Sequence, residues 1–217
     1  MRQNLRTLTV IDALTNALRD RILTEDIPSN TVLPELLVAT EYSVARPSAR
    51  AALDRLAQEG LLRRESNKAA RVPRLDSDDV WDLYTSRIFL ERAVVSELAR
   101  RQLVPADARA AHATFQQSVL ERSLPGIVTA DIGFHLAMVE ALASPRISRM
   151  FQTVIGEAHL CMAQVQTHHL LSADLIAAEH SSILEAIESG DDGAAALRLD
   201  EHLTHARGRL LLYLATP

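Results

Sequence analysis

Four side chains that can bind a metal ion stand among apolar residues in the second half of the chain. Asp131 and His135 are four residues apart, so a helix would place both on one face. His180 and His202 occupy similar positions on two other predicted helices, among apolar residues spaced three and four apart. A carboxylate or an imidazole inside an apolar face is costly to bury unless it has a partner. A divalent metal would be a partner common to all four.

Three imidazoles and one carboxylate suit zinc, with nickel or manganese as alternatives, and leave coordination positions for water or a ligand oxygen. Helical bundles commonly build such sites from facing helices. For a single histidine, a core position satisfied by a local hydrogen bond is the commoner state, but for the set we prefer the metal site. The remaining histidines lack this pattern and are expected mostly on the surface, with His159 as the one that could face the same cavity: His112, His159, His168, His169 and His205.

A pair of arginines in the first third of the chain indicates a different chemistry. Arg46 and Arg50 are four residues apart at the start of a predicted helix over 46–60, whose apolar positions face elsewhere. In a helix-turn-helix these positions reach base edges or phosphates, and the planar fork of arginine can donate two hydrogen bonds to guanine. The pair alone would also fit an ordinary solvated helix, so the order of the surrounding elements decides. The further DNA contacts we expect are Ser48, Lys68 and Arg71.

Those surrounding elements predict a winged helix-turn-helix. Apolar residues at helical spacing predict a helix from residue 10 to 22, a short helix over 34–40 and the helix over 46–60, closed by Gly60. Strands are expected over 61–64 and 70–73, with the loop of a wing between them. Ser29 and Asn30 make the turn after the first helix, and Asn can adopt a positive φ there.

The rest of the chain predicts helices only. A polar linker over 75–79, with Ser77 as the expected N-cap, leads into helices at about 78–103, 105–122, 124–142, 146–169, 173–189 and 192–214. Prolines stand at the starts of three of them, where a missing N–H costs nothing. We therefore expect a mainly α protein: a DNA-binding domain over 1–74, the linker, and an antiparallel bundle of six or seven helices over 80–217.

Charge separates the same two regions. The net charge is -5, yet residues 1–74 carry twelve Lys or Arg against nine Asp or Glu, while residues 75–217 carry eleven against nineteen. This asymmetry suggests two domains with different partners. The sequence has no apolar run of membrane-spanning length and no signal-peptide pattern, and its single cysteine, Cys161, excludes a disulfide framework. We therefore expect a soluble cytoplasmic protein.

Residues 8–74 resemble the DNA-binding domain of the GntR family. The matching pattern is Leu33-x-Glu35-x-x-Val38-Ala39, Val44-x-Arg46, Arg50-x-Ala52-Leu53, Leu56 and Glu59-Gly60-Leu61. The resemblance implies that Arg46 and Arg50 read the operator and that Lys68 contacts DNA from the wing. The chain departs from the family in the wing, which lacks the usual glycines, and at Ala45 and Ala51.

Residues 80–212 resemble the FCD effector domain of the FadR subgroup of GntR regulators. The matching pattern is Arg87-x-x-x-Glu91, Asp131-x-x-x-His135, Glu179-His180-x-x-Ile183 and Asp200-x-His202-Leu203. In metal-containing members an Asp and three His hold an ion inside the bundle, and a small carboxylate effector completes its coordination. The resemblance therefore implies that Asp131, His135, His180 and His202 are ligands. It implies an effector clamp for Arg87, whose alternative role is an intrahelical pair with Glu91. Arg146 stands where the family commonly has Asn, and could face either the ligand or solvent.

Together these patterns predict a ligand-responsive transcription regulator, acting as a repressor and not as an enzyme. A homodimer would match a palindromic operator through its two-fold symmetry. A small organic acid bound beside the metal would change operator affinity by reciprocal coupling. Two alternatives stay open: a metal-dependent enzyme acting on a small carboxylate, and a regulator whose metal is purely structural.

Overall fold

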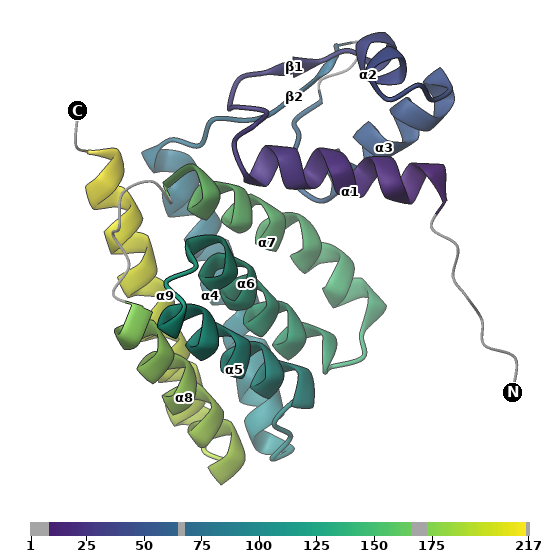
Figure 1. Cartoon of the computed structure of the whole chain (residues 1–217). Coiled ribbons are helices and arrows are strands. Elements are labelled where there is room, and N and C mark those ends of the chain that lie inside the picture. Colours follow the sequence, from purple (N-terminus) through teal and green to yellow (C-terminus); the bar gives the residue numbers. More distant parts are fainter. Residues whose placement is uncertain (1–8, 65–67, 166–172, 216–217) are drawn as a thin grey trace, which may run out of the picture. The chain divides into compact units, whose positions relative to one another are not determined.

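The structure is a computed structural model that describes residues 9–64, 68–165 and 173–215. It divides into two compact units, Met1–Arg74 and Leu75–Pro217, and each is described by itself (Figure 1). His168 and His169, and residues 65–67 of the expected wing loop, lie outside the described residues. Helices dominate both units, which confirms the mainly α fold predicted from the sequence.

The first unit contains three helices around a small apolar core. They are α1 (Val10–Leu23), α2 (Glu35–Glu41) and α3 (Arg46–Gln58). A capping box begins α1, because the side chain of Thr9 accepts from the backbone of Asp12 while Asp12 bonds back to Thr9. Gly60 follows α3 with a φ of 77°, as predicted for a residue that ends a helix. The buried positions of α3 that pack on α1 and α2 are Ala49, Ala52, Leu53 and Leu56.

The wing differs from the predicted hairpin. Strand β2 (Ala70–Arg71) pairs in antiparallel fashion with β1 (Val32–Leu33), a strand that the sequence did not predict. The expected strand over 61–64 contributes one bridge, in which Arg63 and Arg71 exchange backbone hydrogen bonds of 2.9 and 3.0 Å. Leu61 and Leu62 do not extend this pairing, because their N–H groups bond back to the carbonyl of Leu56 at the end of α3.

The turn before β1 has the geometry expected of its asparagine. Asn30 has a φ of 68°, and its N–H donates to the carbonyl of Val72 at 2.8 Å. The N–H of Val72 returns a bond of 3.0 Å to the carbonyl of Thr31. A residue in the left-handed conformation therefore directs the chain into β1, a conformation that Gly adopts most readily and that Asn also tolerates.

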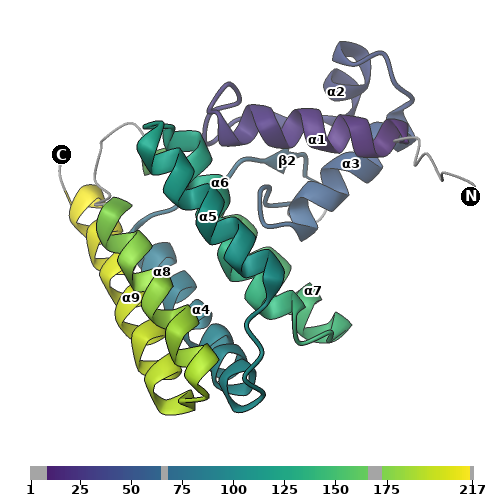
Figure 2. The ribbon, with the colours of Figure 1, turned by 60° about the horizontal axis from the view of Figure 1, so that its bottom comes forward.

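The second unit is a helical bundle in the described part of the chain. Its helices are α4 (Ser77–Arg100), α5 (Ala106–Leu120), α6 (Leu124–Glu140), α7 (Pro145–Val165), α8 (Ala173–Ser189) and α9 (Asp192–Leu214). Helices α4, α8 and α9 lie side by side, and α5, α6 and α7 form a second layer (Figures 1 and 2). Contacts between α4 and α6 and between α5 and α8 join the layers, so residues of α6, α8 and α9 can meet inside the bundle.

The ends of these helices follow local capping chemistry. Asp76, and not the predicted Ser77, is the N-cap of α4, because one of its oxygens accepts from the N–H groups of both Asp78 and Asp79 at 3.0 Å. Both residue types cap well, and only Asp76 completes a capping box with Asp79. Gly190 closes α8 with a φ of 79°, and Asp191, one of the two aspartates that the sequence offers as the cap, is the N-cap of α9.

Candidate functional site

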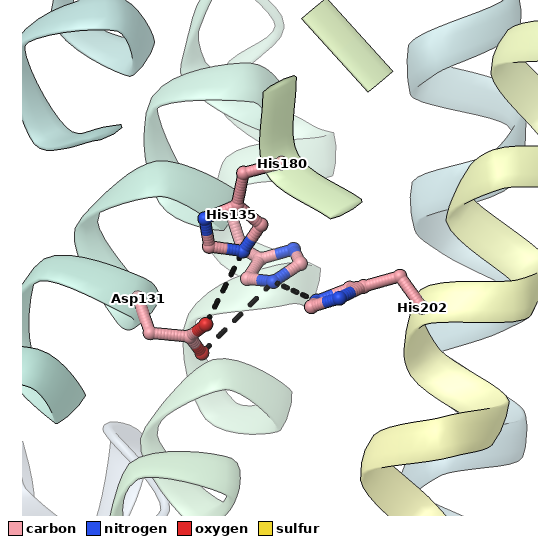
Figure 3. A group of neighbouring side chains, drawn as sticks. All are labelled: Asp131, His135, His180 and His202. Carbon is pink, nitrogen blue, oxygen red and sulfur yellow. Dashed lines mark hydrogen bonds and ion pairs between the residues drawn. The ribbon is translucent and has the colours of Figure 1, made fainter. Parts of the chain in front are cut away.

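Asp131, His135, His180 and His202 meet inside the bundle. Asp131 and His135 come from α6, His180 from α8 and His202 from α9, and their side chains point toward one another (Figure 3). None of the four is more than 4% exposed. One ligand-type atom from each can be chosen so that all lie within 4.8 Å of one another. The structure thus brings together the four residues that the sequence singled out, from three separate helices.

Two glutamates determine which imidazole nitrogens face the centre. The Nδ1 atom of His135 lies 2.5 Å from Oε2 of Glu91, and Nδ1 of His202 lies 2.8 Å from Oε2 of Glu179. An ionised carboxylate only accepts hydrogen bonds, so each Nδ1 carries the hydrogen and each Nε2 keeps its lone pair. The two Nε2 atoms face each other at 3.1 Å. Two facing lone pairs are favourable only when something positive lies between or beside them.

His180 is held mainly by aromatic packing. Its ring stacks on Phe134, with centroids 3.9 Å apart and an angle of 13° between the planes, and meets Phe115 edge-on. Its Nε2 lies 3.3 Å from Oδ1 of Asp131, and neither ring nitrogen has a protein hydrogen-bond partner. A fully buried imidazole whose nitrogens lack hydrogen bonds is costly, and a cation bound at one of them would reduce that cost.

The protonation states of the cluster suit metal binding. Burial lowers the pKa of His180, and it lowers the pKa of His202 to about 4, so both imidazoles are neutral near pH 7. Burial opposes ionisation of Asp131, but the neighbouring imidazoles hold the pKa of its carboxyl well below the usual range. Neutral imidazoles and an ionised carboxylate are the forms that bind a cation.

The donor set fits a divalent ion. Nitrogen and oxygen ligands bind zinc at about 2.0–2.2 Å, which small shifts of these side chains would achieve. The two carboxylates behind His135 and His202 are the partners that metal-bound imidazoles usually have. One of the two orphaned nitrogens of His180 would gain a partner in the same step. A cation would therefore relieve several otherwise unfavourable features of this core at once.

Arg87 lies beside the four residues and makes the intrahelical pair that the sequence suggested. It is 1% exposed, and its Nε donates to Oε1 of Glu91 at 2.8 Å. Burial raises the pKa of Glu91, but the charge of Arg87 and the hydrogen bond from His135 lower it, and the net result is about 2. Arg87 also lines a small cavity with Asp131 and His202, and its Nη2 has no hydrogen-bond partner. The pair with Glu91 thus leaves part of the guanidinium unpaired in a residue that lines this cavity.

The other two residues expected near the effector do not line this cavity. His159 is half-buried on α7, one position away from Ala158, which faces the core. Arg146 is exposed in the first turn of α7. The inward face of α7 is formed by Phe151, Ile155, Ala158 and Met162, whose spacing leaves both basic residues outside it.

His112 was expected on the surface, and this expectation is wrong. It is 8% exposed on α5, and its Nε2 lies 3.0 Å from the hydroxyl of Ser181. The centroid of its ring lies 5.8 Å from the centroid of the His180 ring. The signal was present in the sequence, because Ala108, His112 and Phe115 share one face of α5. His205, in contrast, is exposed as expected, and its Nδ1 lies 2.8 Å from Glu179.

In the first unit, the arginines of α3 border a groove of about 800 Å³. The side chains of Arg46 and Arg50 are 68% and 66% exposed, on the face of α3 away from the core. Glu35 of α2 organises them: its carboxylate accepts from Arg46 at 3.1 Å and lies 3.9 Å from Arg50. Arg64, which the sequence did not single out, donates to the other oxygen of Glu35 and to Asp54. The carboxylate of Glu35 thus forms ion pairs with three guanidinium groups.

The remaining predicted DNA contacts are placed differently. Ser48 is half-buried in the first turn of α3. Lys68 is exposed and lines the groove with the arginines. Arg71 is exposed on β2, and its Nη1 donates to the carbonyl of Asn30 at 2.9 Å, so it supports the turn before β1. Lys68 therefore has the position predicted for the wing cation, and Arg71 has a structural bond as well.

A three-helix unit with a small sheet, joined to a helical bundle with a buried His/Asp cluster, defines a two-part regulator with an output unit and a sensing unit. Comparison with known proteins agrees. Residues 11–72 match the bacterial regulatory proteins of the gntR family, and residues 82–205 match the FCD domain. The chain therefore belongs to the GntR family of regulators and carries an FCD domain as its effector unit. It is a DNA-binding, ligand-responsive transcription regulator.

Three relatives illustrate the match. The gluconate operon transcriptional repressor of Bacillus subtilis is 36% identical over 88 residues, which cover 41% of this chain and 36% of the repressor. An HTH-type transcriptional regulator from the TAR-I ttuE-ttuC' intergenic region of Agrobacterium vitis is 28% identical over 61% of this chain and 81% of its own length. A GntR regulator structure from Rhodococcus sp. RHA1 shares the fold, with a TM-score of 0.79, 24% identity and coverage of 93% and 97% of the two chains.

Among the described residues, no helix is both long and apolar enough to cross a membrane.

Proposed function

We propose that Asp131, His135, His180 and His202 hold a divalent metal ion, with zinc favoured and nickel or manganese as alternatives. The observation that carries this proposal is the convergence of four buried ligand atoms within 4.8 Å, with the Nε2 lone pairs of two imidazoles turned inward by glutamates. The ion would neutralise the buried carboxylate and polarise a ligand oxygen bound to it.

Metal analysis of full-length protein purified without added metal tests this proposal. Wild-type protein should retain about one equivalent of a divalent metal, and His180→Ala should lose most of it. His159→Ala, which changes a histidine of α7 outside the cavity, is the matched control and should keep the metal. Full occupancy in His180→Ala would overturn the site.

We further propose that a small carboxylate binds beside these residues and controls operator binding. The cavity next to Asp131 and His202 offers the free Nη2 of Arg87, and a guanidinium recognises a carboxylate well. Coupling is reciprocal: an acid that lowers operator affinity must itself bind less tightly when the operator is bound. Relief of repression is the sign we expect, as in a repressor released by its ligand.

A ligand-responsive regulator can be distinguished from an enzyme, and from a regulator with a purely structural metal, by the effect of adding carboxylates. An enzyme would convert the acid, whereas the proposed regulator binds it saturably without turnover. A purely structural metal would leave both the melting temperature and operator affinity of the metal-loaded protein unaffected by carboxylates. Calorimetry combined with product analysis on one set of acids separates the three cases.

In the first unit, we propose that Arg46 and Arg50 read the operator from the groove, with Lys68 on the adjacent backbone and Ser48 and Arg71 at its margin. The exposure of both arginines supports this role, as does their fixed relation to Glu35, because a preorganised guanidinium loses less entropy on binding. Binding of full-length protein to an operator selected from random duplex DNA is the direct test.

We propose that the protein acts as a homodimer and that the exposed face of α4 joins the copies. Phe89, near the middle of α4, is 78% exposed, and Trp81 on the same face is 55% exposed. Exposed Asp78 and Asp82 lie toward one end of this face, and Arg92 and Arg100 toward the other. Two antiparallel copies of α4 would therefore set acidic ends against basic ends around a pair of phenylalanines, as a two-fold interface requires.

A further inference from the structure

A second guanidinium reaches the cavity beside the proposed metal site. The wall that contains Arg87, Asp131 and His202 also contains Arg209 of α9. Arginine is usually a surface residue, so nothing in the sequence marks Arg209 as part of a site. Its place in this wall nevertheless puts a cation beside a cavity that already has one.

Arg209 has donors without acceptors. Both its Nε and its Nη2 are buried and have no hydrogen-bond partner in the described structure. The charge of Arg209 helps to lower the pKa of Glu179, but the two carboxylate oxygens of Glu179 lie 2.8 Å from the Nδ1 atoms of His202 and His205. Buried donors left unpaired are unfavourable, and a charged group is more so than a neutral one. An anionic group entering the cavity would satisfy them.

Arg87 and Arg209 lie at different ends of the cavity, so each could bind a different anionic group of one ligand. Arg87 is anchored through Glu91, which also holds the ligand residue His135, so this guanidinium lies at the metal end of the cavity. Arg209 is seven residues beyond His202 on the same face of α9, which is about 10 Å along the helix axis. Ala206 lies between His202 and Arg209 along α9 and also lines the cavity, where its side chain is small.

We infer that the effector is a dicarboxylate, with one carboxylate at the metal and Arg87 and the second at Arg209. This inference rests on the proposed function, since it assumes that carboxylates bind at the metal. A monocarboxylate would leave the donors of Arg209 unsatisfied, and the protein should therefore discriminate against it. Arg209 is in these terms a specificity-determining residue.

The cavity must widen to admit such a ligand. Its free volume is about 20 Å³, which is room for about one water molecule. Met162 and Arg209 are wall residues with long flexible side chains, whereas the side chain of Arg87 is anchored by Glu91. Reorientation of the two flexible side chains would bring the guanidinium of Arg209 onto the ligand while it opens the space.

Isothermal titration calorimetry on zinc-loaded full-length protein tests the inference. The probes are succinate and glutarate, each paired with its monomethyl ester, which removes one charge with little change of shape. Wild-type protein should bind at least one diacid about tenfold or more tightly than its ester, since a hydrogen bond to a charged group is worth that much. Arg209→Gln should lose this preference while keeping its zinc and its affinity for the ester.

Arg207→Gln is the matched control. It removes a guanidinium from the same helix, but Arg207 lies over the ring of Trp81, 4.0 Å from its centroid, and not in the cavity wall. It should keep the wild-type preference, and Arg209→Lys, which retains the charge, should keep part of it.

The outcomes separate this inference from the proposed function. If zinc-loaded wild-type protein binds no carboxylate of either kind, the proposed effector site fails and this inference fails with it. If diacids and esters bind equally, or if Arg209→Gln keeps the preference, only the role of Arg209 is overturned.

Discussion

The Nε2 atoms of His135 and His202 lie 3.1 Å apart with no hydrogen to share, because each ring has its Nδ1 hydrogen on a glutamate. The arrangement depends on charges that come from elsewhere: Glu91 lies on α4 and Glu179 on α8, whereas the two histidines lie on α6 and α9. Four helices thus cooperate to point two lone pairs at one spot. We propose that the glutamates are positioning residues, whose removal should weaken binding of the proposed metal ion.

Glu179→Gln should weaken zinc binding by about 10- to 100-fold, because an amide holds the imidazole hydrogen less well than a carboxylate and makes the ring a poorer donor. Competition with a chelator of known affinity measures the change. Glu201→Gln, an exposed change on α9 at a residue paired with Arg198, should leave the affinity unaltered. Equal affinities for the two variants would remove Glu179 from the site.

Arg46→Ala and Arg50→Ala should each lower operator affinity by about tenfold or more if the side chain reads a base, since a bidentate contact contributes roughly 1–3 kcal/mol of discrimination. Titration at several salt concentrations distinguishes base contacts from phosphate contacts, because only the latter reduce the salt dependence by about one ion. Arg198→Ala, which removes an exposed cation from α9, is the control. Unchanged affinity in both variants would show that α3 does not read DNA.

Glu35→Gln should make DNA binding stronger but less selective. The carboxylate holds Arg46 and Arg64 and reduces the positive charge that the groove presents to phosphates. Without it, non-specific affinity at low salt should rise several-fold, since binding to phosphate is electrostatic, while the ratio of specific to non-specific affinity falls. Filter binding with operator and with unrelated DNA gives both quantities. A rise in specificity would contradict this account of Glu35.

Phe89→Asp should shift the protein toward monomers and weaken operator binding, because it sets two carboxylates against each other at the centre of the proposed interface. Analytical ultracentrifugation over a range of concentrations measures the shift. Leu120→Asp is a demanding control, because Leu120 is also 78% exposed but lies at the end of α5. A dimer that survives Phe89→Asp and dissociates with Leu120→Asp would move the interface to another face.

Most of the architecture could be predicted because it depends on short-range patterns. Gly60, Asn30 and Gly190 mark chain reversals through their allowed φ values, and the apolar spacing within each helix identifies its buried face. Strand β1 escaped prediction because two residues carry almost no pattern, and its partner is 39 positions away in the register that joins Val32 to Arg71. Such pairing is tertiary information.

In the candidate site, too, short-range patterns could be predicted and contacts between distant residues could not. Polar residues inside apolar stripes revealed the four candidate ligands, since burial there demands a partner. The bonds from Glu91 to His135 and from Glu179 to His202 span 44 and 23 residues and could not be read from spacing. Arg209 was hidden for a different reason: it stands beside the inward positions Ala206 and Leu210, and only the folded cavity shows that its donors are unpaired.

The centre of the bundle contains Arg87, Glu91, Asp131 and the histidines where a helical protein usually has leucine. A metal ion and an effector bound in such a core would stabilise it, because a ligand that binds only the folded form adds stability that grows with the logarithm of the ligand concentration. The lifetime of the regulator in the cell should then follow the supply of its ligands: starved of them, the chain opens more often and is exposed to proteolysis. Abundance, as well as occupancy, becomes a readout of the chemistry that the protein senses.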